Sequence, residues 1–426
     1  MNKPSTHTIP NEALETGSDM TRNRQQQKRF GHYGLIFFII LLNVFAPLST
    51  DMYLPALPTL NDYFATTEAL VNLSLTIYFA FYCVGILLWG PFSDKFGRRP
   101  TLIINSLLFA GASILCACSA NIYLLIFSRI WQGVGVGGML TVSVAIVKDC
   151  FSGRMRSQVL SFVSAMTVIA PIVAPVLGGI LLLVAEWQVV FVILAAFGLL
   201  SLLFSLLYCE TLPEAERNRG PLRNSWAQLA VVGRRPGFII PAILCSLQMA
   251  AFLSYLQLSS YIYIDFFGLS EQQYSYFFAA SALGAIFGPL TYARWLYRWN
   301  KGFVGLLSFA LASVTGLLML FFGALAPFAF WLAYTLFGFL HSAMRPYSLD
   351  LLLAQQEGDT GSASSLINAL GTLCGVIGMM TVTLWGGNHI FSLSLYILVS
   401  SLLALIGWAI FLRSPIPCIG LRKDRP

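Results

Sequence analysis

The stretch GPFSDKFGRRP, residues 90–100, joins two long apolar runs and combines glycines with one acidic and three basic side chains. Gly90 allows neighbouring helices to approach closely, and Asp94 can cap a helix or accept hydrogen bonds. Arg98 can bind carbonyl oxygens or a carboxylate on a neighbouring bundle of helices. The stretch also suits a charged tight turn on the cytoplasmic side of a membrane. The two apolar runs on either side of the stretch help to decide between these interpretations.

Apolar runs dominate the composition of the chain. Hydrophobic residues make up 57% of its 426 residues and charged residues only 10%, whereas soluble domains have about 25% charged residues. Most runs reach the roughly 20 residues that a membrane-spanning helix needs. We therefore predict an all-α membrane protein with twelve transmembrane helices, at residues 33–58, 70–91, 101–118, 122–147, 158–184, 187–208, 238–263, 275–297, 302–323, 327–349, 362–384 and 391–412.

The basic residues predict the orientation of these helices. Of the 25 lysines and arginines, 23 lie in the two tails or after even-numbered runs, and none lies in a loop after an odd-numbered run. The other two, Arg129 and Arg345, fall in runs four and ten. The positive-inside rule then makes both termini cytoplasmic. The net charge of +7 reflects this topology, so we expect the lipid bilayer as a partner and no nucleic acid.

The longest internal connection divides the runs into six and six. It covers residues 210–237 and holds five arginines. We predict a disordered cytoplasmic tail at 1–30, six-helix bundles at 31–209 and 238–413 joined by this cytoplasmic linker, and a second cytoplasmic tail at 414–426. No loop is long enough to fold as a soluble domain. Paired six-helix halves are a transporter architecture with a substrate site near the midplane.

Asp51 is the only carboxylate well inside any of the apolar runs. An ionisable side chain at that depth costs about 2.5 to 3.5 kcal/mol on insertion scales, which indicates a functional site. Counted along their helices, Asp51 and Arg129 each lie about 10 Å from the outward end, so they share a depth. Burial favours the neutral acid and a nearby guanidinium favours the charged one, so a substrate that displaces either group could switch proton binding.

Structural explanations of the same two residues stay open. Asp51 could form a static buried ion pair, or a local hydrogen bond with backbone that Pro55 leaves unpaired. Arg129 could be a tether between helices, because an arginine does not deprotonate and acts only as a fixed charge.

The stretch at residues 90–100 resembles the signature loop of the major facilitator superfamily. The match is the ordered string G-x-x-x-D-x-x-G-R-R, and it agrees with the twelve-run layout. The resemblance implies two bundles that alternate access to a central site. It also implies a latch between the bundles on the cytoplasmic side, formed by Gly90, Asp94, Gly97, Arg98 and Arg99.

Three further stretches narrow the resemblance. STDMYLPALP at 49–58 is similar to the first-span motif of the drug:proton antiporters, especially the bicyclomycin and chloramphenicol resistance subfamily. RIWQGVG at 129–135 is similar to the fourth-span motif to which proton transfer is attributed in those families. APIVAPVLGG at 170–179 resembles the fifth-span motif of exporters, with Ala174 where the wider motif has glycine.

Two further groups of residues are candidates for function. The fifth-span motif predicts a gating helix, although close packing explains the same residues equally well: Pro171, Pro175, Gly178 and Gly179. Polar and aromatic side chains in the first, fourth and seventh runs could line a substrate cavity, with helix packing or interfacial aromatics as the alternative: Asn43, Tyr53, Gln132, Gln248, Tyr255 and Gln257.

Residues and resemblance together predict a proton-coupled secondary transporter that exports small, largely apolar drugs from a bacterium across its inner membrane. Asp51 binds the proton, while Arg129 and Gln132 set its affinity. We expect the proton gradient to supply the energy, with no cofactor or metal, small-molecule substrates and protons as partners, and a monomeric chain.

A proton symporter or facilitator that imports a metabolite is the nearest alternative, because the fold serves either direction. A membrane enzyme or a sensor is a different class. No metalloprotease, nucleophile-elbow or phosphate-loop motif occurs in the sequence, and it contains no output domain.

Overall fold

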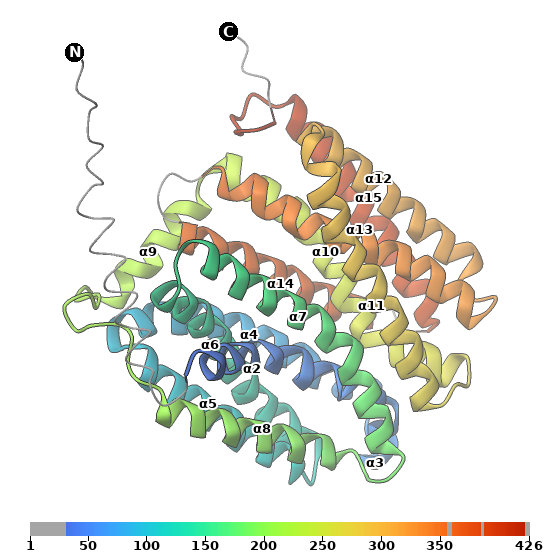
Figure 1. Ribbon diagram of the computed structural model, residues 1–426. Helices are drawn as coiled ribbons and strands as arrows, with labels where there is room; N and C mark the ends of the chain where they lie inside the picture. The colour runs from blue at the N-terminus through green and yellow to red at the C-terminus, as the bar shows by residue number, and fades with distance from the viewer. Residues whose placement is uncertain (1–30, 356–359, 385–386, 422–426) are drawn as a thin grey trace.

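A computed structural model of the protein describes residues 31–355, 360–384 and 387–421. Helices make up its regular structure, and no strand occurs in those ranges (Figure 1). The predicted tail at 1–30 and residues 422–426 of the second tail lie outside the described residues.

The first half of the chain forms six long helices and two short ones. These are α2 (Gly31–Asp51), η1 (Leu54–Ala56), α3 (Leu57–Tyr63), α4 (Glu68–Phe96), α5 (Arg98–Ala117), α6 (Ile122–Cys150), α7 (Gly153–Leu182) and α8 (Gln188–Leu207).

The connection between the halves carries a helix of its own, α9 (Leu222–Gly233), which the sequence analysis does not predict. The second half follows as α10 (Pro236–Ser260), η2 (Tyr261–Phe266), α11 (Glu271–Arg294), η3 (Leu296–Arg298), α12 (Lys301–Phe322), α13 (Pro327–Leu353), α14 (Thr360–Leu384) and α15 (His389–Arg413).

Eleven helical segments within the described ranges are long and apolar enough to cross a membrane. The predicted all-α membrane fold is therefore confirmed. The exception is α13, at the position of the tenth run, because polar residues such as His341 and Arg345 lower its apolar content although it has 27 residues. The count of twelve membrane crossings and the cytoplasmic termini stay predictions.

Helices of the same half pack closely on one another, and one large buried hydrophobic cluster contains residues of both halves. In the first half, α6 packs on α4 and α5, and α5 also packs on α8; in the second, α11 packs on α13, α12 on α15 and α10 on α14. Glycine makes the closest of these contacts possible. A Cβ on Gly85 of α4 would lie 2.6 Å from the carbonyl oxygen of Val134 on α6, so a larger residue would force the two helices apart.

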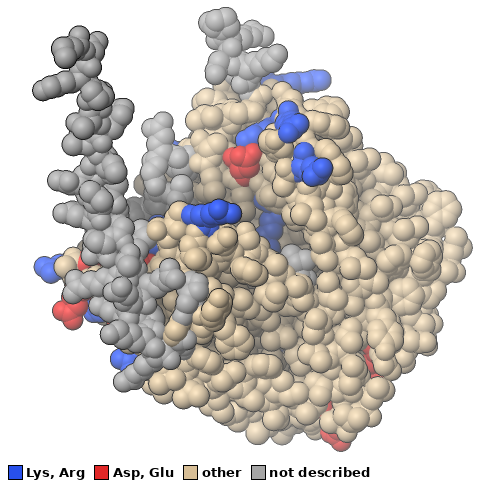
Figure 2. Space-filling model, in the orientation of Figure 1, with Lys and Arg blue, Asp and Glu red and all other residues tan. Residues whose placement is uncertain are grey.

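The two ends of the molecule differ. At one end, here called the sealed end, Glu68 of α4 forms a salt bridge of 3.3 Å with His389 of α15, and α7 packs against α11. Lysines and arginines gather at the opposite end, here called the basic end, where α4, α6 and α11 end and α5, α7 and α12 begin: Lys95, Arg98, Arg99, Lys148, Arg154, Arg156, Arg294, Arg298 and Lys301. Figure 2 shows lysine and arginine side chains on the upper part and left edge of the molecule.

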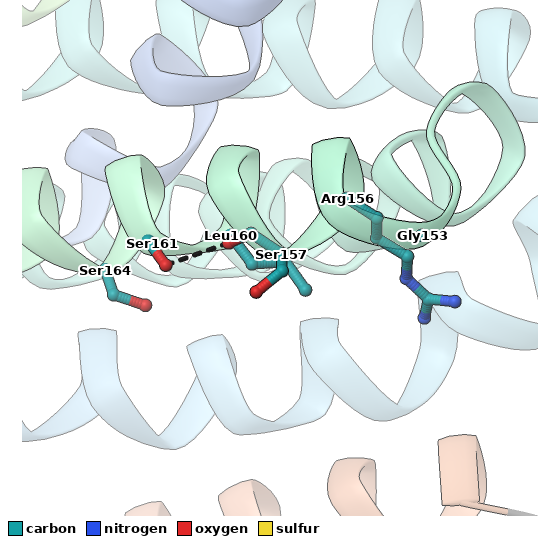
Figure 3. Close-up of a pocket in the computed structure, with 6 residues that line it drawn as sticks. All are labelled: Gly153, Arg156, Ser157, Leu160, Ser161 and Ser164. Atoms are coloured by element: carbon teal, nitrogen blue, oxygen red, sulfur yellow. Dashed lines mark hydrogen bonds between the residues drawn. The ribbon is translucent and has the colours of Figure 1, made fainter. Parts of the chain in front are cut away.

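Near the basic end, the first half of α7 faces a hollow of about 620 Å³. Arg156, Ser157, Leu160, Ser161 and Ser164 line it and are all exposed. Figure 3 shows their side chains on one side of α7. Because α7 meets α11 near the sealed end, the two halves are in contact there and stand apart on this side of the basic end.

Candidate functional site

The first membrane segment breaks directly after Asp51. α2 ends at that residue, and the chain continues through a turn into η1 and α3. The cause is Pro55: an unbroken helix would need the amide of residue 55 to donate to the carbonyl of residue 51, and proline has no amide hydrogen. The run predicted as one helix over 33–58 is thus two helices with a joint, and the joint carries the buried acid.

Asp51 is buried and makes few polar contacts. Its exposed fraction is 4%, and its carboxylate accepts one hydrogen bond of 2.8 Å from the hydroxyl of Thr50. It forms no salt bridge within the described ranges. It interacts electrostatically with Tyr78 of its own half and with Tyr274 and Tyr334 of the other half. Asp51 therefore lies at the interface between the halves.

Arg129 lies beside this joint and is not an ion-pair partner of Asp51. Its guanidinium donates to the carbonyl of Ser49 at 3.0 Å and to the side-chain oxygen of Gln132 at 2.5 Å. Its central carbon lies 4.2 Å from the ring centre of Tyr78 and 5.1 Å from that of Tyr53. Arg129 thus contacts Ser49, two residues before Asp51, in agreement with the depth predicted by counting residues. Its guanidinium, however, faces aromatic rings, which stabilise a cation.

The polar residues expected to line a cavity in the first half connect its helices. Asn43 of α2 donates to Ser143 of α6 at 2.9 Å, and the hydroxyl of Tyr53 forms a hydrogen bond of 2.9 Å with a serine of α4. Gln132 donates from its amide to Ser113 of α5 at 2.8 Å. All three are buried, as the packing alternative requires.

The second half presents aromatic rings and an unpaired amide. Tyr255 stacks on Tyr334 with ring centres 3.3 Å apart, and Gln248 forms a long hydrogen bond of 3.4 Å with a serine of α15. Gln257 is fully buried, and neither polar atom of its amide has a hydrogen-bond partner in the described part of the chain. The π-helix η2 begins four residues later, directly after the end of α10, and π-helical distortions are frequent at functional sites. Sequence reasoning missed Tyr334, which no motif marks.

The signature stretch forms a tight helix joint at the basic end. Gly97 alone separates α4 from α5, with φ of +106°, a conformation that favours glycine. Arg98 donates to Asp94 at 2.5 Å and to Asp149, at the end of α6, at 2.9 Å. The carboxylate of Glu210 accepts the backbone amide of Arg98 at 3.0 Å.

Within the described ranges, the hydrogen-bond partners given for this joint belong to the first half or to the segment that follows it. Arg99 donates from its guanidinium to the carbonyl of Leu206 at 2.8 Å, and Gly90 faces Thr141 of α6. No hydrogen bond between the stretch and the second half is described for these residues, although α4 itself packs against α14 of that half. The role of the stretch as a latch stays a prediction.

The fifth-span motif joins both halves to the Asp51 joint. α7 is a continuous helix with Pro171 and Pro175 inside it. A Cβ on Gly178 would meet the backbone of Met52, the residue after Asp51. A Cβ on Gly179 would lie 3.2 Å from the carbonyl of Glu271, in α11 of the other half. Two adjacent glycines thus contact the two halves.

Comparison with protein families and curated sequences gives clear matches. The family model described as Major Facilitator Superfamily matches residues 39–379. The chain is 35% identical over 263 residues to the uncharacterised MFS-type transporter YdgK of Bacillus subtilis (strain 168), covering 61% of this chain and 65% of YdgK. It is 31% identical over 247 residues to the multidrug resistance protein MdtL of Salmonella heidelberg (strain SL476), covering 58% of this chain and 61% of MdtL. The matches span less than two thirds of these relatives.

Solved structures share the architecture. A crystal structure of the peptide transporter POT in complex with sulfate aligns with a TM-score of 0.73, over 92% of this chain and 97% of that chain. The two sequences are 16% identical, so the likeness concerns the fold alone.

Proposed function

Because the chain belongs to the Major Facilitator Superfamily and is therefore a multi-pass membrane transporter, we propose that it exports small, largely apolar organic compounds in exchange for protons. We also propose that the protein lies in the bacterial inner membrane and that it belongs to the bicyclomycin and chloramphenicol resistance subfamily. The resemblance of residues 49–58 and the name of the relative MdtL, a multidrug resistance protein, support the proposal.

The observation that carries the proton step is the isolation of Asp51. Its carboxylate is buried at the interface, with one hydrogen bond from Thr50 and no salt bridge in the described ranges. A charge in such a place costs several kcal/mol unless it is paired, and proton binding removes it. Protonation of Asp51 therefore favours the state in which the interface is closed around it, and closure of the interface in turn favours protonation of Asp51.

The joint after Asp51 connects proton binding to movement of the halves. The backbone of Met52 packs against Gly178, and the neighbouring Gly179 packs against α11 of the second half. A shift at the end of α2 therefore acts on the helix that contacts both halves. In the proposed cycle, the protonated form favours closure at the sealed end, and release of the proton favours its opening.

The proton gradient supplies enough energy for this exchange. One proton that crosses 100 mV releases about 2.3 kcal/mol. This corresponds to roughly a fiftyfold concentration gradient of a neutral substrate. Such a gradient is sufficient for drug resistance.

The test is drug accumulation in everted membrane vesicles with an acid lumen, with amphenicols and bicyclomycin as the first panel. Asp51→Asn keeps the shape of the protonated acid but cannot exchange a proton. We expect it to abolish accumulation driven by the pH gradient and to retain exchange of labelled for unlabelled drug without a gradient. Glu186→Gln, which changes an exposed acid outside this interface, is the matched control and should transport normally. Wild-type accumulation by Asp51→Asn would remove the proton site from the proposal.

The direction of coupling separates export from the symport alternative. Drug added to acid-loaded everted vesicles should release protons into the medium if the protein is an antiporter. A symporter would instead remove protons from the medium as the drug enters. A pH electrode in the medium distinguishes the two signs.

A further inference from the structure

Arg345 is a charged group that the proposed proton site does not use. It is exposed on α13, although Ala343, Met344 and Tyr347 around it are buried. Within the described residues it takes part in no salt bridge. A guanidinium keeps its charge at all physiological pH values, so on a helix among apolar neighbours it needs water or an anion beside it.

Arg345 faces the first half of the molecule. It interacts electrostatically with Tyr82 of α4, which belongs to that half, and with His341 one turn earlier on α13. Its guanidinium therefore lies on the inner wall between the halves and not against lipid. From Arg345 to Leu353, the last residue of α13, the helix extends about 12 Å. The charge thus lies well inside the molecule, away from the basic end.

Aromatic surface borders this charge on both walls. The ring of His341 stacks on Phe252 at 4.8 Å and on Phe337 at 6.2 Å. On the opposite wall, the ring of Tyr82 lies parallel to that of Tyr78 at 6.4 Å. Phe337 and Tyr78 are fully buried, whereas His341, Phe252 and Tyr82 are half-buried. A planar apolar group can pack on these three half-buried rings while a charged group attached to it reaches the guanidinium.

We propose that Arg345 anchors the acidic group of the substrate, and that the compounds carried include aromatic acids such as carboxylates and sulfonates. A guanidinium binds such groups through two parallel hydrogen bonds, which an ammonium cannot match. The inference deepens the proposed function and rests on it in one respect, since the gap between the halves must be the route of the substrate. Asp51 then serves the proton and Arg345 the substrate.

The experiment measures binding to the purified full-length protein in lipid nanodiscs, without any gradient. The probes are 1-naphthoate and 1-naphthamide at neutral pH, which share a ring system and differ in charge. We expect the wild type to bind the acid at least about tenfold more tightly than the amide. Arg345→Gln should bring the two affinities to within roughly twofold, and Arg345→Lys should keep part of the preference. Arg298→Gln removes an exposed arginine elsewhere in the second half and should change nothing.

Binding of naphthamide by each variant shows that the cavity is intact, so a lost preference cannot result from unfolding. Equal binding of the two probes by the wild type would overturn the inference, as would a preference that survives in Arg345→Gln. A preference for the acid that depends on Arg345, together with the absence of proton-driven transport in vesicles, would overturn the proposed function and leave the anion subsite in place.

Discussion

Asp51 and Arg129 are two buried ionisable residues of opposite sign, and their environments differ. Arg129 is fully buried; its Nη1 donates two hydrogen bonds and its guanidinium lies over the faces of Tyr53 and Tyr78, while its Nε and Nη2 have no hydrogen-bond partner in the described part of the chain. Asp51 has one hydrogen bond and no counter-ion among the described residues. A fixed charge with compensation suits a structural anchor, whereas an acid without compensation suits a group that gains and loses a proton.

Arg129→Lys tests the anchor. Lysine keeps the charge but loses the planar group that spans Ser49, Gln132 and the tyrosine rings. We expect the free energy of unfolding to fall by about 1 to 3 kcal/mol, measured by thermal unfolding in detergent. Arg298→Lys changes an arginine that lies over Tyr297 at the surface and should alter stability by less than about 0.5 kcal/mol. An unchanged melting temperature in Arg129→Lys would show that the stacking contributes nothing.

At the scale of the elements, the joint after Asp51 and helix α7 form one unit. Pro55 ends α2, which leaves the backbone around Met52 free to turn, and Gly178 lets α7 pack directly against that turn. The adjoining Gly179 faces α11 of the other half. Because successive residues of a helix point about 100° apart, two adjacent glycines can contact two different neighbours.

Gly178→Ala tests the packing of α7 on the joint. The added methyl group would meet the backbone carbonyl of Met52, which has no flexible end to move aside. We expect a loss of about 1 to 3 kcal/mol in stability, read from thermal unfolding, and impaired transport. Gly111→Ala is the control, because a Cβ there meets nothing within 4 Å. It should be neutral or slightly stabilising, since alanine favours a helix. Equal effects of the two substitutions would exclude a special contact at Gly178.

At the scale of the whole molecule, the sequence predicts the architecture well. Long apolar runs separated by charged loops leave few alternatives in a bilayer, because each spanning segment must satisfy its own backbone hydrogen bonds. Besides the break of the first run after Asp51, two elements escape this reasoning. The helix α9 lies in a polar linker, and the π-helix η2 lies at the end of the seventh apolar run, where no sequence motif marks it. Both contact helices distant in sequence, α9 packing on α4 and α14 and η2 on α3 and α15.

The site is only partly predictable from the sequence, for a related physical reason. Depth in the membrane follows from counting residues, so Arg129 does meet the end of α2 near Asp51. Rotation about each helix axis depends on packing, so counting cannot tell that Arg129 faces tyrosine rings and not Asp51. Likewise, the sequence identifies the residues of the signature stretch but not the residues that bind them. Glu210, which accepts the amide of Arg98, lies more than a hundred positions further along the chain.

The sealed end brings together charges from both halves. His389 of the second half contacts Glu68 of the first, and Asp265 interacts electrostatically with His389, Glu68 and Asp62. His389 is thus the only basic partner described within a group of three acids. A protonated His389 offsets the repulsion between Glu68 of the first half and Asp265 of the second, across the line along which the halves must separate. The end should therefore open more readily when the histidine is removed than when Glu68 is.

Paired spin labels at the sealed end can measure this difference. Thr67 of the first half and Ala324 of the second are exposed there and suit labelling once the accessible cysteines are replaced. We expect His389→Gln to shift the distance distribution toward the open form by up to about fivefold in population, since a half-exposed pair contributes at most about 1 kcal/mol. Glu68→Gln should shift it less, because it removes one of the acids along with the pair. Glu186→Gln, an exposed acid at the same end, should leave it unchanged. A larger shift in Glu68→Gln than in His389→Gln would mean that the pair itself, and not relief of acid repulsion, holds this end closed.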